Sequence, residues 1–139
     1  FYKPIDIPIP FNKDEFITRI KKNINSNTKI IFLSHITSPT AIIFPVEEIC
    51  KLAKDLGIIS IIDGAHAPAH INLNLEKIGA DIYTGACHKW MLCPKGVSFL
   101  YSSKKLQKQL EPLIISWGWE ESDTPSDSKF LDHNQYRQN

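Results

Sequence analysis

This 139-residue chain has few cysteines, no long apolar run and almost no net charge. The three cysteines are an odd number at irregular spacing, which argues against a disulfide framework and favours a reducing, cytoplasmic setting. No apolar run reaches the roughly 18 residues that a membrane span needs, because charged or polar side chains interrupt every candidate. The sixteen basic and fifteen acidic residues nearly balance, so the chain lacks the positive net charge that is typical of proteins that bind nucleic acid or an anionic membrane. A soluble globular protein is therefore expected.

Both ends of the sequence look incomplete. The first residue is not Met, and the opening lacks the basic, apolar and small-residue succession of a signal peptide. Residues 134–139 offer no closing element. Since 139 residues are enough for one domain with a core, we expect a fragment that holds one domain or part of one.

Helix and strand patterns alternate along the chain. Asn12 and Glu15 form a capping-box-like start for a first helix, whose apolar residues recur at helical spacing to Ile24. Pro45 suits the first turn of a second helix, and Gly57 suits the position just past its end. The pattern predicts strands at residues 29–34, 58–62, 81–84 and 97–101, short helices at 75–78 and 103–110, and a loop-rich tail at 116–139.

The strands at 29–34 and 58–62 are apolar throughout rather than alternating. Continuous apolar strands are typical of parallel sheets that are buried on both faces. Strand, helix and strand within this length form a βαβ unit. The sequence therefore predicts an α/β architecture with a mostly parallel sheet.

Polar residues follow three of the predicted strands, at the edge where ligands collect in open parallel sheets. Asp63 ends one strand, residues 35–40 follow another, and residues 84–89 follow a third. Their convergence predicts a pocket. Taken alone, an Asp after a strand more often caps the next turn, and a lone Lys89 or His66 is more often solvated.

The combination of these residues indicates a Schiff-base site for pyridoxal 5'-phosphate. Lys89 has the amine that can bond to the cofactor aldehyde, provided that its surroundings favour the neutral form. Asp63 can keep the pyridine nitrogen protonated, so that the ring accepts the electrons of an α-carbanion. His66, His88 and Thr84 can donate hydrogen bonds to the phenolic oxygen and the phosphate.

Several motifs in sequence order resemble enzymes of the class V aminotransferase fold. They are Asp63-Gly64-Ala65-His66-Ala67-Pro68, residues 79–85, Cys87-His88-Lys89-Trp90 and Pro94-Lys95-Gly96, with further likeness at 34–40, 45–49 and 116–120. Within that superfamily the chain is most similar to the isopenicillin N epimerase-like branch, whose relatives are the cysteine desulfurases. The resemblance implies part of the large domain of a fold-type I pyridoxal-phosphate transferase, with its three layers and mostly parallel sheet.

The resemblance also implies a role for each site residue. Lys89 matches the lysine that bonds the cofactor and then shuttles the α-proton of the substrate. Asp63 matches the partner of the pyridine nitrogen, and His66 matches the residue that hydrogen-bonds the phenolic oxygen. His88 matches a histidine that lies near the cofactor phosphate.

Some positions depart from the family pattern. Ala86 stands where many cysteine desulfurases carry a phosphate-binding serine, so Thr84 or backbone N–H groups are the expected substitutes. Ser38 and Ala41 replace a common asparagine and glycine. An earlier phosphate-binding segment and the small C-terminal domain have no counterpart, so residues 1–139 are expected to be a partial cofactor-binding domain.

The implied function is that of a pyridoxal-phosphate-dependent epimerase or aminotransferase with an amino acid substrate. The same fold leaves a cysteine desulfurase or selenocysteine lyase as an alternative. A partial domain exposes sheet edges and apolar surface, which favours a homodimer or other self-association. We expect weak or no cofactor binding and negligible turnover from the isolated chain, and a non-catalytic self-associating fragment is the alternative from another class.

A zinc site is the strongest rival from the residues alone, because His66 and His70 are four apart and a Cys/His group lies at 87–93. That spacing needs a helix, which Pro68 would break, so no metal site is predicted. The two cysteines of 87–93 are not a Cys-x-x-Cys pair, and thiol catalysis is not expected either.

Overall fold

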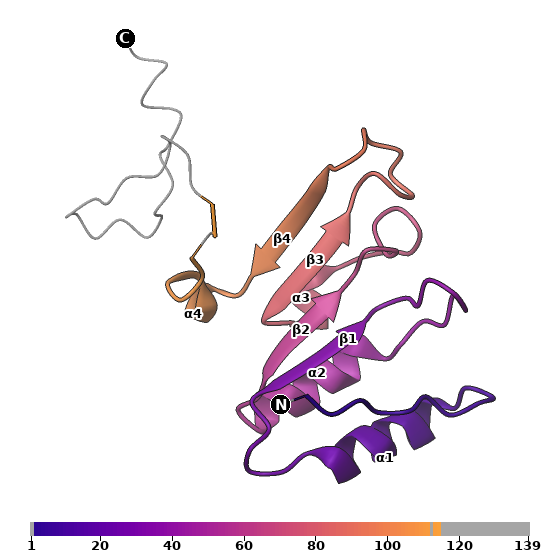
Figure 1. Cartoon of the computed structure of the whole chain (residues 1–139), viewed down its shortest axis with the longest axis vertical. Coiled ribbons are helices and arrows are strands. Elements are labelled where there is room, and N and C mark those ends of the chain that lie inside the picture. The colour runs from indigo at the N-terminus through magenta and orange to yellow at the C-terminus, as the bar shows by residue number, and fades with distance from the viewer. Residues whose placement is uncertain (1, 112, 115–139) are drawn as a thin grey trace. The chain divides into compact units, whose positions relative to one another are not determined.

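The computed structural model describes residues 2–111 and 113–114 (Figure 1). The chain divides into two compact units, Phe1–Ser103 and Lys104–Asn139. All strands and the first three helices of the described residues belong to the first unit. The second unit contributes one short helix, α4 (Lys104–Gln107), which is shorter than the predicted 103–110. The predicted tail at 116–139 lies outside the described residues.

Four strands form one sheet in the order β1-β2-β3-β4. They are β1 (Ile30–Ser34), β2 (Ile59–Asp63), β3 (Ile82–Ala86) and β4 (Ser98–Ser102). The first three run parallel, and β4 returns antiparallel to β3. The predicted strands are confirmed with boundary shifts of one or two residues, and the mostly parallel α/β sheet is confirmed with them.

Helices α1, α2 and α3 begin and end within a residue or two of the positions that the sequence signals predicted. In α1 (Lys13–Asn23), the side chain of Asn12 accepts a hydrogen bond from the Glu15 N–H at 2.9 Å. Helix α2 (Val46–Asp55) starts after Pro45 and carries two glutamates in its first turn, where they complement the helix dipole. Helix α3 (Leu75–Ile78) ends at Gly79, whose left-handed φ of 66° suits glycine.

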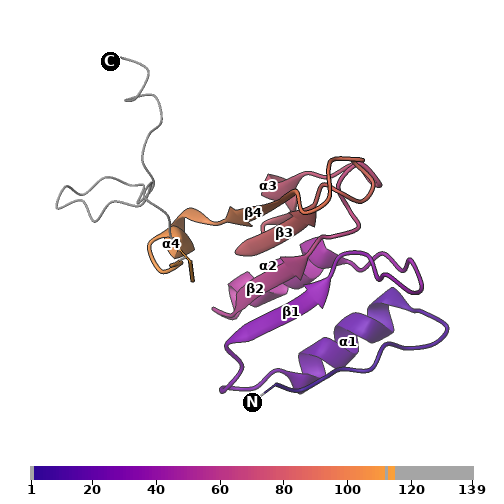
Figure 2. The same ribbon diagram turned by 45° about the horizontal axis from the view of Figure 1, so that its top comes forward.

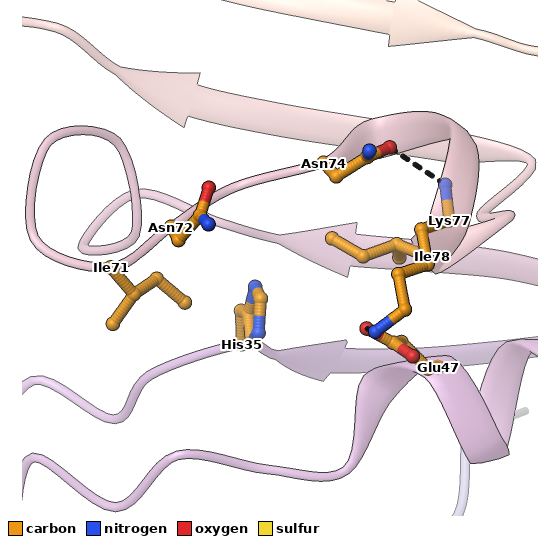
Figure 3. A pocket seen from close by; sticks show the side chains of 7 residues that line it. All are labelled: His35, Glu47, Ile71, Asn72, Asn74, Lys77 and Ile78. Atoms are coloured by element: carbon orange, nitrogen blue, oxygen red, sulfur yellow. Dashed lines mark hydrogen bonds and ion pairs between the residues drawn. The ribbon is translucent and has the colours of Figure 1, made fainter.

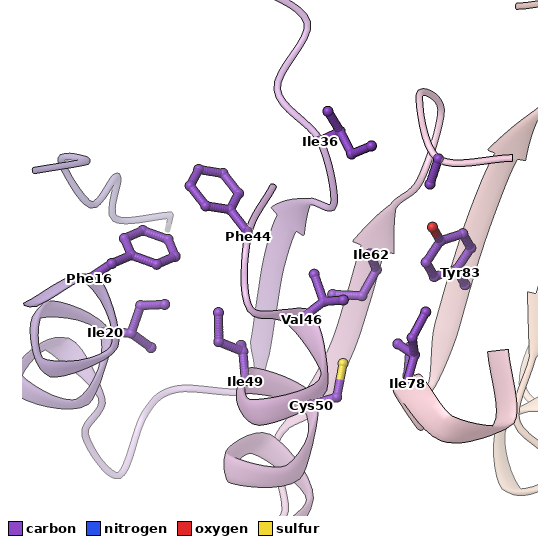
Figure 4. Close-up of a cluster of buried hydrophobic side chains, with 12 residues drawn as sticks. Phe16, Ile20, Ile36, Phe44, Val46, Ile49, Cys50, Ile62, Ile78 and Tyr83 are labelled. Atoms are coloured by element: carbon purple, nitrogen blue, oxygen red, sulfur yellow. The ribbon is translucent and has the colours of Figure 1, made fainter. Parts of the chain in front are cut away.

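The core lies between one face of the sheet and helices α1, α2 and α3 (Figures 1 and 2). Figure 4 shows its side chains, which come from α1, α2, α3, the inward residues of β2 and β3, and the segments that connect these elements. Ile49, Ile62 and Tyr83 are fully buried. This packing fixes the positions of β2 and β3, the two strands that carry the candidate site.

The opposite face of the sheet is open. Ile30 and Phe32 of β1 are 51% and 68% exposed, and Leu100 of β4 is 62% exposed. The prediction of burial on both faces is therefore wrong for the described residues, which supply helices to one face only. An apolar parallel strand indicates that both faces are suited to burial, but it does not reveal which part of a protein covers each.

Candidate functional site

The carboxyl ends of β1, β2 and β3 meet at one edge of the sheet, as predicted, because the three strands are parallel. In the register, Asp63 lies beside Ser34 on one side and Thr84 on the other. Strand β3 continues to Ala86, two residues beyond the predicted end, so Thr84 lies within the sheet rather than in the loop. The structure thus brings Asp63 and Thr84 together as neighbours.

Asp63 caps the turn that follows β2. Its Oδ1 accepts a hydrogen bond from the Ala65 N–H at 2.9 Å, which is the local role that an Asp after a strand commonly has. Its Oδ2 makes no hydrogen bond to any described residue. The half-buried carboxylate therefore fixes the turn with one oxygen and keeps an acceptor for a further partner with the other.

Lys89 lies against His66, although 23 residues separate them in the sequence. The distance from Lys89 Nζ to His66 Nε2 is 2.9 Å. On the other side of the same ring, the Trp90 Nε1–H points to His66 Nδ1 at 3.4 Å. The His70 ring stacks on Trp90 with centroids 4.2 Å apart, and His70 Nδ1 donates to the His66 carbonyl oxygen at 3.1 Å. We refer to Lys89, His66, His70 and Trp90 as the Lys89 cluster.

The surroundings of His66 favour its neutral form. Partial burial lowers the pKa of its imidazole most, and the positive charge of Lys89 lowers it further. Asp63 opposes this by raising the pKa, and His70 lowers it slightly. The net direction is downward from the usual 6.5, so His66 is a neutral donor and acceptor near neutral pH.

A compact loop between β3 and β4 presents Lys89. The Cys93 N–H bonds to the Cys87 carbonyl at 3.1 Å, and the Leu92 N–H bonds to the Lys89 carbonyl at 3.2 Å. His88 is exposed, and its Nδ1 donates to the carbonyl of Val97 at 3.2 Å. His88 therefore helps to close the loop, and its Nε2 is the ring nitrogen left for a ligand.

A buried pair of residues, which the sequence did not predict, lies beneath the site. The hydroxyl of Tyr83 and Nδ1 of His35 lie 2.8 Å apart, and both side chains are buried. Burial raises the pKa of the Tyr83 hydroxyl and lowers the pKa of His35. Gly64 makes room for this pair, because a Cβ there would lie 2.1 Å from the Tyr83 ring. A glycine directly after a strand-ending Asp was the one sequence cue for this close approach.

A separate cavity of about 320 Å³ lies on the helical side of the sheet (Figure 3). His35, Glu47 and Lys77 line it together with neighbouring residues of the 71–78 segment, and Lys77 pairs with Glu47 at 3.1 Å. It shares no residue with the Lys89 cluster, and it is not assigned to the candidate site.

No three His, Cys, Asp or Glu side chains of the described residues gather in a way that could hold a metal ion. His66 and His70 lie in turns on either side of Pro68 rather than on one helix face, as the proline predicted. Within residues 2–111 and 113–114, no helix is long and apolar enough to cross a membrane.

Comparison with known proteins gives consistent matches. The sequence profile of the family described as aminotransferase class-V matches residues 6–136. Isopenicillin N epimerase from Streptomyces clavuligerus is 38% identical over 112 residues, which cover 81% of this chain and 28% of that protein. The isopenicillin N epimerase of Amycolatopsis lactamdurans is 33% identical over 117 residues, covering 84% of this chain and 29% of that protein.

Solved structures match in the same way. The apo structure of cysteine desulfurase from Thermococcus onnurineus NA1 superimposes with a TM-score of 0.71 at 29% identity, covering 83% of this chain and 28% of the other. The cysteine desulfurase CsdA from Escherichia coli has a TM-score of 0.69 at 18% identity, covering 78% of this chain and 27% of that one, and supports the fold alone. The chain spans less than a third of the length of these relatives.

Proposed function

The chain belongs to the aminotransferase class-V family, and we propose that it forms part of the cofactor-binding domain of a pyridoxal-phosphate-dependent enzyme that acts on an amino acid. The observation that carries this proposal is the contact of 2.9 Å between Lys89 Nζ and His66 Nε2, beside the strand end that holds Asp63. The matches to two isopenicillin N epimerases favour epimerisation, with transamination as the related outcome.

The residues at the strand edge fit the donors and acceptors that this cofactor needs. Lys89 offers an amine held by a neutral imidazole, and Asp63 has a carboxylate oxygen without a partner among the described residues. His66 has a ring nitrogen at the Lys89 amine. When bound, pyridoxal phosphate supplies an electron sink that stabilises a carbanion at the substrate α-carbon.

Each residue then has a defined task. Lys89 would hold the cofactor and move the proton at the α-carbon of the substrate, while Asp63 would hold a proton on the pyridine nitrogen. His66 would donate a hydrogen bond to the phenolic oxygen. Thr84, which neighbours Asp63 in the sheet, is a proposed donor to the ring or phosphate, and His88 is proposed to lie near the phosphate. Return of the proton to the opposite side of the α-carbon gives epimerisation.

Cysteine-type chemistry is the second candidate, because other relatives carry such names. A hercynylcysteine sulfoxide lyase from Schizosaccharomyces pombe is 34% identical over 116 residues, and a probable cysteine desulfurase from Methanothermobacter thermautotrophicus is 33% identical over 100. Incubation of the full-length enzyme, of which this chain is proposed to be a part, with amino acids in D₂O distinguishes the candidates. Deuterium at the α-carbon of an otherwise intact amino acid supports epimerisation, a keto acid supports transamination, and sulfur released from cysteine supports the second candidate.

The open apolar face of the sheet supports a further part of the proposal, that the chain associates with itself, as a homodimer or in another form. Phe32 and Leu100 expose most of their surface there. Exposed apolar side chains on an open sheet face favour association in water.

A titration with pyridoxal phosphate of the full-length enzyme, of which this chain is proposed to be a part, tests the proposed function. We expect a visible absorbance of protein-bound cofactor that the Lys89→Ala variant lacks and that Asp63→Asn alters. Lys95→Ala is the matched control, because Lys95 is exposed in the same loop and contacts no described residue through its amine. Retention of the absorbance by Lys89→Ala would refute the assignment.

A further inference from the structure

The ladder between β2 and β3 is the shortest of the described sheet, although these two strands carry the candidate site. It has three residue pairs, the last of which joins Asp63 and Thr84, whereas the β1–β2 and β3–β4 ladders have five pairs each. His66 follows β2 and Lys89 follows β3, so their contact depends on how these two strands are aligned.

Two buried polar residues extend this ladder at its start. Ser60 and Asp81 directly precede the first paired residues, Ile61 and Ile82, and they are only 1% and 6% exposed. The Ser60 N–H and hydroxyl both donate to Asp81 Oδ2, at 2.9 and 3.2 Å. The Ser60 hydroxyl oxygen accepts in turn from the Asp81 N–H at 3.0 Å. Side chains therefore add reciprocal hydrogen bonds beside the first backbone pair of the ladder.

These bonds select a register that burial alone leaves open. Tyr83 is fully buried on the core side, which excludes a shift of β3 by one residue, because such a shift turns every side chain to the other face. A shift by two residues keeps the same face toward the core but moves the strand by about 6.6 Å. That movement is large beside the 2.9 Å contact between Lys89 and His66. The reciprocal bonds form in one register only, since Ser60 has to lie beside Asp81.

We propose that Asp81 is a positioning residue for the site around Lys89. By bonding to Ser60, it holds β3 in the register that brings Lys89 to His66. The proposal rests on the proposed function for its purpose, because Lys89 and His66 are the residues that would bind the cofactor. Asp81 precedes β3 and Lys89 follows it, so Asp81 acts through the position of the strand and not by contact with a ligand.

Three variants of the full-length enzyme that contains this chain test the proposal. Asp81→Ala removes the acceptor of two hydrogen bonds and leaves buried donors of Ser60 without it. Asp81→Asn keeps an oxygen that can accept from the Ser60 N–H, so it is the conservative rescue. Ile20→Ala is the stability control, because it removes a buried side chain from α1, outside the sheet.

The rate of deuterium incorporation at the α-carbon separates positioning from stability. It is measured in D₂O at saturating cofactor, with a saturating concentration of the amino acid that the wild-type enzyme exchanges fastest. A displacement of about 1 Å can cost about a hundredfold in rate, so Asp81→Ala should lower the saturated rate by about 10- to 100-fold. Asp81→Asn and Ile20→Ala should stay within about twofold of the wild type.

Three results of this measurement would overturn the proposal. The first is a wild-type rate in folded Asp81→Ala, and the second is an equal loss in Ile20→Ala, which would make the effect one of stability. The third is an Asp81→Asn variant as slow as Asp81→Ala, because that variant keeps the bond to the Ser60 N–H.

Amide hydrogen exchange without cofactor tests the register itself. Asp81→Ala should speed exchange in β2 and β3 by about tenfold relative to exchange in α1, because the shortened ladder opens locally. Unchanged exchange in the folded variant contradicts the proposal. Ser60→Ala removes only the hydroxyl, and it decides both measurements if Asp81→Ala does not fold. Since this measurement contains no pyridoxal phosphate, a failure of the proposed function in the cofactor titration is distinguishable from a failure of this inference.

Discussion

Gly64→Ala should destabilise the chain more than a surface glycine would, because of what its new methyl group meets. An ideal Cβ at this position lies 2.1 Å from the Tyr83 ring. Tyr83 is fully buried and hydrogen-bonded to His35, and its ring stacks on Phe99. The Gly64 N–H is itself bonded to the Thr84 carbonyl at 2.8 Å. Neither the ring nor the backbone can move away without losing a buried contact.

Overpacking of this kind costs about 2 kcal/mol, within the usual 1–3 kcal/mol. With an m-value of about 2 kcal/mol per molar urea, the unfolding midpoint should fall by about 1 M. Urea unfolding followed by circular dichroism measures the change. The turn that carries Asp63 and His66 should shift as well, so Gly64→Ala should also weaken the cofactor absorbance that depends on Lys89.

A double-mutant cycle with Tyr83→Leu tests the reason for the loss. Leucine lacks the ring carbons and hydroxyl that the new methyl group would meet, so Gly64→Ala should cost less than about 1 kcal/mol in that background. An equal cost in both backgrounds would show that the aromatic ring is not the obstacle. No cost in the wild-type background would refute the reasoning altogether.

Three further changes test other parts of the structure. Burial lowers the pKa of His35 below 6.5, so at lower pH the unfolded chain binds a proton that the folded chain does not, and the urea midpoint should fall as the pH drops below 6.5. His35→Asn, whose amide can still bond to Tyr83, should make the urea midpoint depend less on pH. An equal slope in the variant and the wild type would contradict this explanation. Asn12→Ala removes a helix cap and should cost about 1 kcal/mol in urea unfolding, and a cost below about 0.3 kcal/mol would show that the cap contributes little. Phe32→Lys should reduce the self-association that light scattering measures. Leu56→Lys makes the same charge change at a residue that lies just after α2 and is 53% exposed, and it should not reduce self-association. Equal effects of the two variants would show that the added charge, and not the sheet face, is responsible.

Much of the fold could be predicted because its signals are local. The cap at Asn12 and the glycine at 79 mark helix ends through the preferences of single residues, and both have the predicted geometry. The convergence at the sheet edge followed from strand direction, since parallel strands place their carboxyl ends together. Asp63 has the turn-capping role that its position alone suggests, with its second oxygen left for another partner.

What could not be predicted depends on contacts between distant residues. The sequence does not show that His35 bonds to Tyr83, because 48 residues separate them and neither belongs to a recognisable motif with the other. Trp90 directs its N–H to His66, which lies 24 residues earlier, and no local pattern shows this contact. The roles of Thr84 and His88 toward a cofactor remain predictions.

The central claim is that Lys89 is the lysine that bonds pyridoxal phosphate. The most direct test is to incubate the full-length enzyme that contains this chain with one equivalent of cofactor, reduce the adduct with borohydride and map the modified peptide by mass spectrometry. The position of Lys89 beside His66 and the strand end at Asp63 predicts that the label is concentrated on Lys89, with little on the exposed Lys95 of the same loop. A label spread over the other lysines, in a pattern that Lys89→Ala leaves unchanged, would contradict the account.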